Sequence, residues 1–122
     1  MEVRYGVEAH STDTFGRVLC TARNHHFVVD GPVANGCPGE AITPVELFLS
    51  GIASCGVELV QVIAKEQGLI PIEVHAIVEG KLDRNNPVRE DLSVFNRVWL
   101  DFRLKGLTEA QGIQLIEMFK RK

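Results

Sequence analysis

Residues 43–55 read TPVELFLSGIASC, and they open the longest helix that the sequence predicts. Thr43 suits the N-cap position, where its hydroxyl accepts from a free backbone N–H, and Pro44 suits the first helical position. Glu46 follows three residues after the cap, which completes a capping box. These three residues together predict that a helix begins at Pro44.

The rest of this helix is almost entirely apolar. It continues to about Gln67, and Gly68 suits the left-handed residue that ends many helices. Between Leu47 and Ala64 its sole charged residue is Glu58, and a helix that is apolar nearly all round is buried. Polar and small residues interrupt the run, which argues against a membrane span of about 20 apolar residues. A chain of 122 residues has little else to cover such a helix, so we expect a homodimer.

Strands are predicted on both sides of this helix, and a second helix follows them. The expected strands run from Val3 to His10, Phe15 to Arg23, His25 to Asp30, Ile70 to Leu82 and Val94 to Lys105. A glycine- and proline-rich loop fills residues 31–43, and a polar loop fills residues 83–93. Thr108 and Gln111 form another capping box at the start of the second helix. The predicted order is therefore three strands, a long helix, two further strands and a second helix.

The length suits a single domain over residues 1–122. The sequence stops at Lys120–Arg121–Lys122, where no glycine, proline or further element closes the second helix. We therefore expect the natural protein to continue and this domain to lack its C-terminal end.

The composition is that of a soluble globular protein, with 45% hydrophobic and 24% charged residues. A net charge of −3 argues against a nucleic-acid partner, because such a partner requires a basic stripe. No basic segment followed by an apolar stretch opens the chain, so the sequence predicts no secretory signal. We expect a cytoplasmic protein with neither a nucleic-acid nor a membrane partner.

The three cysteines are Cys20, Cys37 and Cys55, and no two of them form a CxxC pair. An odd and widely spaced set in a cytosolic protein favours free thiols over a disulfide framework. His25 and His26 are adjacent, so they face opposite sides of a strand, and no pair with Cys20 or Cys37 has the spacing of zinc ligands. We therefore predict neither a metal site nor a cofactor.

The stretch 43–55 resembles the signature of OsmC-like proteins. In that family a [T/N]-P-x-E-L opening leads through small residues to Ala-x-Cys in a central helix, as it does here from Thr43 to Cys55. The glycine-containing loop before the helix and the strand–strand–helix order after it also fit the family. The resemblance therefore covers essentially the whole chain.

This resemblance implies an α+β fold with antiparallel sheets around a central buried helix, in which two sheets of an intertwined homodimer wrap around the central helices. It also implies a cofactor-free, thiol-based peroxidase of oxidative-stress defence, which reduces hydroperoxides, organic ones especially. In the family the helix cysteine attacks the O–O bond and becomes a sulfenic acid. A second cysteine resolves that acid as a disulfide, and a thiol reductant restores the enzyme. An arginine from the N-terminal strands and a glutamate at the helix start assist the attacking thiol.

Carried onto this chain, the pattern assigns the attacking cysteine to Cys55 and the glutamate to Glu46. Arg23 is the first candidate for the arginine, and Arg17 is the second. In the organic-hydroperoxide-resistance branch the glutamate lies one position earlier, where this chain has Val45. The family's resolving cysteine follows a basic helical stretch like 119–122, at which this sequence stops.

The mechanism requires a cation near the attacking sulfur. An ordinary cysteine thiol, with a pKa near ~8.5, is mostly protonated at neutral pH, whereas the thiolate is the nucleophile. Cys55 lies too far along the helix for the N-terminal dipole to help. One guanidinium about 4 Å away contributes ~4 kcal/mol at an effective dielectric near 20.

Each candidate also has a plainer interpretation. Cys55 can be a small buried apolar residue, and Arg23 a solvent-facing strand end. Capping alone explains Glu46, which nine residues place on the opposite helix face from Cys55 and ~13 Å along the axis. Cys37 is either a substitute resolving thiol or an exposed loop cysteine, and Cys20 belongs to a strand core.

Two other functional classes therefore stay open. The first is a non-catalytic small-molecule or acyl-chain binding protein on the same scaffold, which the missing resolving cysteine and Val45 favour. The second is a structural homologue in which Cys55 only packs.

Overall fold

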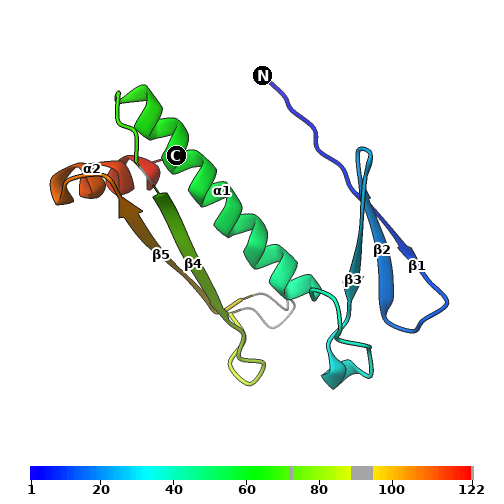
Figure 1. The fold of residues 1–122 in the computed structure, drawn as a ribbon. Coiled ribbons are helices and arrows are strands. Elements are labelled where there is room, and N and C mark those ends of the chain that lie inside the picture. Colours follow the sequence, from blue (N-terminus) through cyan, green and yellow to red (C-terminus); the bar gives the residue numbers. More distant parts are fainter. Residues whose placement is uncertain (72, 89–94, 122) are drawn as a thin grey trace. The chain divides into compact units, whose positions relative to one another are not determined.

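The computed structural model describes residues 1–71, 73–88 and 95–121, and the chain forms two compact units, Met1–Phe48 and Leu49–Lys122. The helices and strands follow the order predicted from the sequence (Figure 1). They are β1 (Glu8–Ser11), β2 (Arg17–Ala22), β3 (His25–Asp30), the short 3-10 helix η1 (Val33–Asn35), α1 (Pro44–Glu66), β4 (Glu73–Lys81), β5 (Arg97–Lys105) and α2 (Glu109–Phe119). Both sheets are antiparallel, so the predicted α+β class is confirmed.

The first unit contains a three-stranded sheet in the order β1-β2-β3. Glu8 pairs with Thr21, so a longer β1 would next pair Val7 with Ala22. Beyond Ala22 the chain turns back into β3, and the sheet offers no further partner. For this reason β1 begins near Glu8, whereas the sequence pattern predicted that it would begin at Val3. Residues 1–7 precede the sheet with exposed apolar side chains at alternate positions, namely Val3, Tyr5 and Val7.

Helix α1 begins as predicted. The backbone N–H of Thr43 donates to Glu46 Oε1 at 3.0 Å, and the Thr43 hydroxyl donates to the same oxygen at 2.8 Å. The Glu46 N–H in turn donates to Thr43 Oγ1 at 3.3 Å. At the other end Gly68 has φ 71°, and Leu69 N–H donates to Ala64 O at 2.8 Å, which closes the last turn. The capping box and the glycine therefore fix both ends of α1.

The second unit packs α2 and most of α1 on one face of the β4–β5 hairpin (Figure 1). Its buried core consists of Val60, Ile63, Ala64 and Leu115, with partly buried apolar residues from β4, β5 and α2 around them. Phe102 and Phe119 meet edge to face, with ring centroids 5.1 Å apart. A Cβ at Gly56 would lie 3.0 Å from the Phe102 ring, so a glycine allows β5 to approach the helix there.

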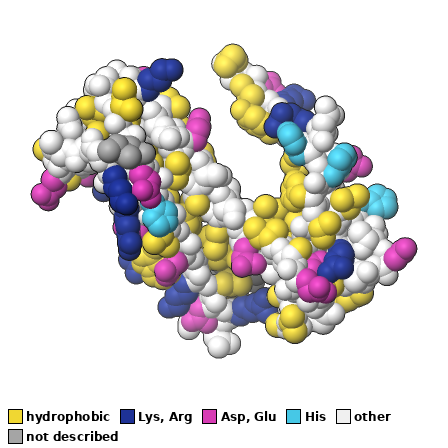
Figure 2. Space-filling view, viewed as in Figure 1, with side chains coloured by type: hydrophobic (Ala, Val, Ile, Leu, Met, Phe, Trp, Pro, Cys, Tyr) yellow, Lys and Arg dark blue, Asp and Glu magenta, His cyan; other side chains and the backbone are white. Residues whose placement is uncertain are grey.

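Helix α1 buries only one side within the second unit. Gly56, Val60, Ile63 and Ala64 are buried, whereas Cys55 is exposed. Apolar side chains also reach the surface in both units on the face shown in Figure 2. The expectation of a helix covered on all sides is thus not met by one chain, because the hairpin and α2 cover a single face. By length and composition α1 would suffice to cross a membrane, and 22% of its most apolar 18-residue stretch is buried within the chain.

The polar loop predicted at 83–93 is described as far as residue 88. Asp83 N–H donates to Asn96 Oδ1 at 2.7 Å, and Asn96 Nδ2 donates to Asn86 O at 2.6 Å, so one asparagine ties the loop to the start of β5. The remainder of that loop and Val94, the predicted first residue of the strand, lie outside the described residues.

The core makes a direct prediction about stability. Replacing Ile63, which is 1% exposed, with alanine should lower the free energy of unfolding by about 2–5 kcal/mol, because a cavity replaces packed methyl groups. Ile113 in α2 is 58% exposed and provides the matched control, for which the same replacement should cost less than about 1 kcal/mol. Urea unfolding of both variants measures the difference. Equal losses in the two variants would contradict this position of the core.

Candidate functional site

Cys55 lies on the side of α1 that faces away from the core of its own unit. Ile52, Leu59 and Val62 share this side, because intervals of three and four residues place side chains on one helix face. We call these four residues the Cys55 stripe. Every member is at least partly exposed in the single chain, so the Cys55 sulfur lies in an accessible surface. The exposed Glu58, three residues after Cys55, borders this otherwise apolar stripe.

The other candidates for the site lie in the first unit. Arg17, Arg23 and Glu46 belong to Met1–Phe48, whereas Cys55 belongs to Leu49–Lys122. Glu46 uses one carboxylate oxygen for the two Thr43 donors, and these hydrogen bonds, the backbone one first, lower the pKa of its carboxyl. Glu46 is therefore ionised at neutral pH and completes the capping box of α1.

Arg23 occupies the turn between β2 and β3. Its φ of 55° lies in the left-handed region, which a residue with a Cβ adopts at some cost, and its side chain is exposed. The tight reversal between Ala22 and His25, which are themselves paired, requires this conformation. The predicted solvent-facing strand end thus describes the surroundings of Arg23 in the first unit.

Arg17, the second candidate, is held by a residue that the sequence analysis did not single out. Its Nε donates to Asp30 Oδ1 at 2.8 Å, and its Nη2 donates to Asp30 Oδ2 at 3.0 Å. These two bonds form a bidentate pair between the first residue of β2 and the last residue of β3, which are paired in the sheet. We call this pair the Arg17–Asp30 clamp. Asp30 lies at the end of a strand, just before Gly31–Pro32, and this position was the one local feature that could have singled it out.

Asp30 also holds the loop that leads into α1. Its Oδ2 accepts from the backbone N–H groups of Glu40 at 3.1 Å and Ala41 at 2.9 Å, and its own N–H donates to Ile42 O at 3.0 Å. The side chain of Asp30 is fully buried. One carboxylate thus joins β2, β3 and the residues immediately before the Thr43 cap.

These hydrogen bonds set the charge of the clamp. The Arg17 guanidinium first, and then the Ala41 N–H, lower the pKa of the Asp30 carboxyl far below its usual range, while burial opposes them. The same bond from Arg17 to Asp30 raises the pKa of the guanidinium. A depressed carboxyl pKa stabilises the fold above the unfolded value near ~3.9, and this contribution is lost as the pH falls below that value.

The other two cysteines are half-buried. Cys20 lies in β2 opposite Phe27, as expected for a strand core. Cys37 places its Sγ against the Cα atoms of Gly16 and Gly31, where an added Cβ would collide with it. Both glycines are thus required for the packing of the Cys37 side chain. Among the described residues no group of three or more His, Cys, Asp or Glu side chains has an arrangement that holds a metal ion.

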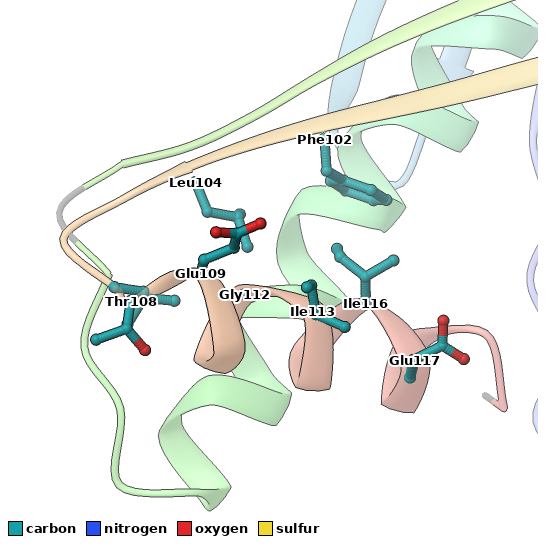
Figure 3. Close-up of a pocket in the computed structure, with 9 residues that line it drawn as sticks. Phe102, Leu104, Thr108, Glu109, Gly112, Ile113, Ile116 and Glu117 are labelled. Carbon is teal, nitrogen blue, oxygen red and sulfur yellow. The ribbon is translucent and has the colours of Figure 1, made fainter.

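A groove of about 380 Å³ lies between β5 and α2. Phe102 and Ile116 point toward each other across it (Figure 3). Its wall is mostly apolar, with two carboxylates from α2, and is lined by Phe102, Leu104, Leu107, Thr108, Glu109, Gly112, Ile113, Ile116 and Glu117. Cys55 does not line this groove, so the thiol of Cys55 and the groove are separate features of the second unit.

Solved structures with the same fold come from several bacteria. An OsmC-like protein from Mycoplasma pneumoniae matches with a TM-score of 0.83 at 15% identity, over 100% of this chain and 84% of that one. An organic hydroperoxide resistance protein OsmC from Legionella pneumophila gives 0.70 at 23% identity, over 96% and 82%. One from Elizabethkingia anophelis, described as an organic hydroperoxide resistance protein, gives 0.71 at 20% identity, over 99% and 84%.

At these identities the structures establish the fold alone. No functionally curated protein matches the sequence significantly. The family model for OsmC-like proteins matches residues 37–122, which is well over half of the chain and includes the whole of α1. The chain therefore belongs to the OsmC-like family.

Proposed function

We propose that this protein is a thiol-dependent peroxidase that reduces hydroperoxides, organic ones in preference, through Cys55. The observation that carries the proposal is an accessible cysteine in an apolar surface of the central helix of an OsmC-like chain. Relatives of the same fold are described as organic hydroperoxide resistance proteins, which supports this substrate class. We place the protein in the cytoplasm, where its thiols stay reduced.

The proposed step is a two-electron transfer. The Cys55 thiolate attacks the outer oxygen of the hydroperoxide, so an S–O bond forms as the O–O bond breaks. The leaving alkoxide takes a proton and departs as the alcohol, and the cysteine becomes a sulfenic acid. A small thiol reductant then condenses with the sulfenic acid and a second thiol releases the reduced cysteine, which requires no resolving cysteine in this chain.

An arginine and Glu46 complete the proposed site. A guanidinium stabilises the thiolate and donates to the leaving oxygen, and Arg23 and Arg17 are the two candidates. Glu46 is ionised and fixed by its cap, so it can order a guanidinium as well as the helix start. Replacing each arginine with glutamine in separate variants decides which of them serves the thiol.

We further propose that the working state is an intertwined homodimer. The Cys55 stripe is a partly exposed apolar helix face, and a second copy would enclose it in an apolar cleft suited to organic peroxides. Residues 1–7 alternate apolar and polar side chains but extend past their own sheet, while β4 and β5 form a sheet of only two strands. Strand exchange between copies would give both features a partner.

A second function is favoured by the groove between β5 and α2. Its volume of about 380 Å³ and its apolar wall fall in the range of small-molecule sites, so the chain can instead be a non-catalytic binder of small apolar molecules or acyl chains. Saturable binding of a fluorescent fatty acid would support this alternative, if hydroperoxides also oxidise Cys55 no faster than free cysteine.

The test of the proposed function is the rate of sulfenic-acid formation on Cys55. We expect cumene hydroperoxide to oxidise it at least tenfold faster than hydrogen peroxide does, because the surrounding surface is apolar. Stopped-flow mixing with a sulfenic-acid trap and mass spectrometry measures both rates and locates the product. Rates equal to that of free cysteine would reject the peroxidase and leave the binding protein.

A further inference from the structure

Asp30 differs from every other charged side chain that the structure describes, because it is the one that is fully buried. A buried carboxylate costs several kcal/mol in desolvation, and replacing such ion pairs with apolar groups is often neutral or stabilising. Stability alone is therefore a weak reason for a charge at this position. Its carboxylate accepts four hydrogen bonds, two from the Arg17 guanidinium and two from the loop before α1, so it fixes the position of that guanidinium as well as the loop.

The geometry of that guanidinium is fixed from one edge. Asp30 accepts hydrogen bonds from Nε and Nη2 of Arg17. The backbone N–H groups of Glu40 and Ala41 also donate to the Asp30 carboxylate and hold it in place. Arg17 remains 31% exposed, so the opposite edge of its planar fork can reach a further acceptor. Glu40 is 79% exposed and 3.4 Å from Nη2, which makes its ion pair a minor contribution.

We propose that Asp30 is the positioning residue for the Arg17 guanidinium in hydroperoxide reduction. The inference rests on the proposed function, and it favours Arg17 over Arg23 as the acting arginine. An arginine side chain that is mobile in solvent loses rotamer entropy each time it is ordered for a turnover. Asp30 orders Arg17 before substrate arrives, whereas Arg23 lies exposed in a turn.

The role of the pair in the reaction follows from the proposed step. As the O–O bond breaks, negative charge moves to the leaving oxygen, and the outer N–H groups of Arg17 donate to it until it is protonated. Asp30 itself contacts neither sulfur nor peroxide in this scheme. It keeps the guanidinium oriented and acts on the rate only through Arg17.

A double-mutant cycle on the full chain tests this dependence. The variants are Arg17→Gln, Asp30→Asn and the pair of both, and the measurement is the second-order rate constant of Cys55 oxidation by cumene hydroperoxide. Arg17→Gln should lower it roughly 100-fold, as loss of one transition-state donor does. Asp30→Asn should lower it roughly tenfold, and adding Asp30→Asn to Arg17→Gln should change it by less than about threefold.

Folding is controlled separately. Asp30→Asn leaves a guanidinium without its anion, so its Tm should fall by roughly 10 °C or more, and rates are measured well below that Tm. Asp30→Glu keeps the charge but moves the carboxylate. It should lower the rate in a chain that retains Arg17, and it should have no further effect in a chain that carries Arg17→Gln. Asp13→Asn, the same change at an exposed aspartate of the first unit, should leave rate and Tm unchanged.

The outcomes separate the two proposals. A fast wild type with a nonadditive cycle supports the positioning role. A fast wild type in which Asp30→Asn lowers the rate equally with and without Arg17, or changes only the Tm, overturns the positioning role and leaves the peroxidase intact. A wild type no faster than free cysteine overturns both.

Discussion

Cys55→Ser is expected to remove rapid oxidation by cumene hydroperoxide altogether, because a serine hydroxyl is neither ionised nor oxidised under these conditions. Cys20→Ser and Cys37→Ser provide matched controls, since each removes one thiol from the same chain. Their half-buried side chains lie in a strand and against two glycines, where neither serves as the attacking group in the proposed step. Both should keep the rate constant within about threefold of wild type.

Mass spectrometry after a single-turnover reaction measures this directly. Wild type should carry one added oxygen, or the adduct of a sulfenic-acid trap, on the peptide that contains Cys55. If Cys37→Ser lost the reaction as completely as Cys55→Ser, the attacking role would pass to Cys37 and the proposed site would be wrong. If oxidised wild type instead formed a disulfide between Cys37 and Cys55, Cys37 would be the substitute resolving thiol.

Local signals explain which parts of the fold were predictable. The ends of α1 depend on contacts within three or four residues, such as Thr43 with Glu46, and the sequence pattern located them to within one residue. The start of β1 depends on where β2 ends, and β2 ends at a turn that pairs Ala22 with His25. An alternating pattern reports that a strand is possible, but it does not report whether a partner is present.

The candidate site shows the same division. Cys55 stands in a local motif, so it was predicted from the sequence, although its role is still a prediction. Asp30 was missed because its partners Arg17, Glu40 and Ala41 lie 10 to 13 positions away, and nothing local marks a strand-end aspartate as buried. The uncovered side of α1 was predictable, because a chain of 122 residues has little else to cover an apolar helix. The composition of α1 did not indicate which of its sides the hairpin and α2 would leave exposed.

That missing cover leads to the second large effect, on the oligomeric state. In the proposed homodimer the Cys55 stripe is an interface, and placing two carboxylates there with Leu59→Glu and Val62→Glu buries unpaired charge. Two such changes, at roughly 2 kcal/mol or more each, should raise the dimer dissociation constant about 1,000-fold. Sedimentation velocity across nanomolar to micromolar concentrations should show a dimeric wild type and a monomeric double variant.

The fold of each chain should survive these changes, because Val62 is 42% exposed and Leu59 is partly exposed in the single chain. Ile113→Glu provides the control, since it places a carboxylate on an exposed apolar residue of α2 outside the stripe, and it should leave the dimer unchanged. A double variant that stays dimeric would show that the copies meet on another surface. If the monomeric variant also lost its preference for cumene hydroperoxide, the apolar surroundings of the thiol would be supplied by the partner chain, so the composition of α1 would reflect the substrate as well as the interface.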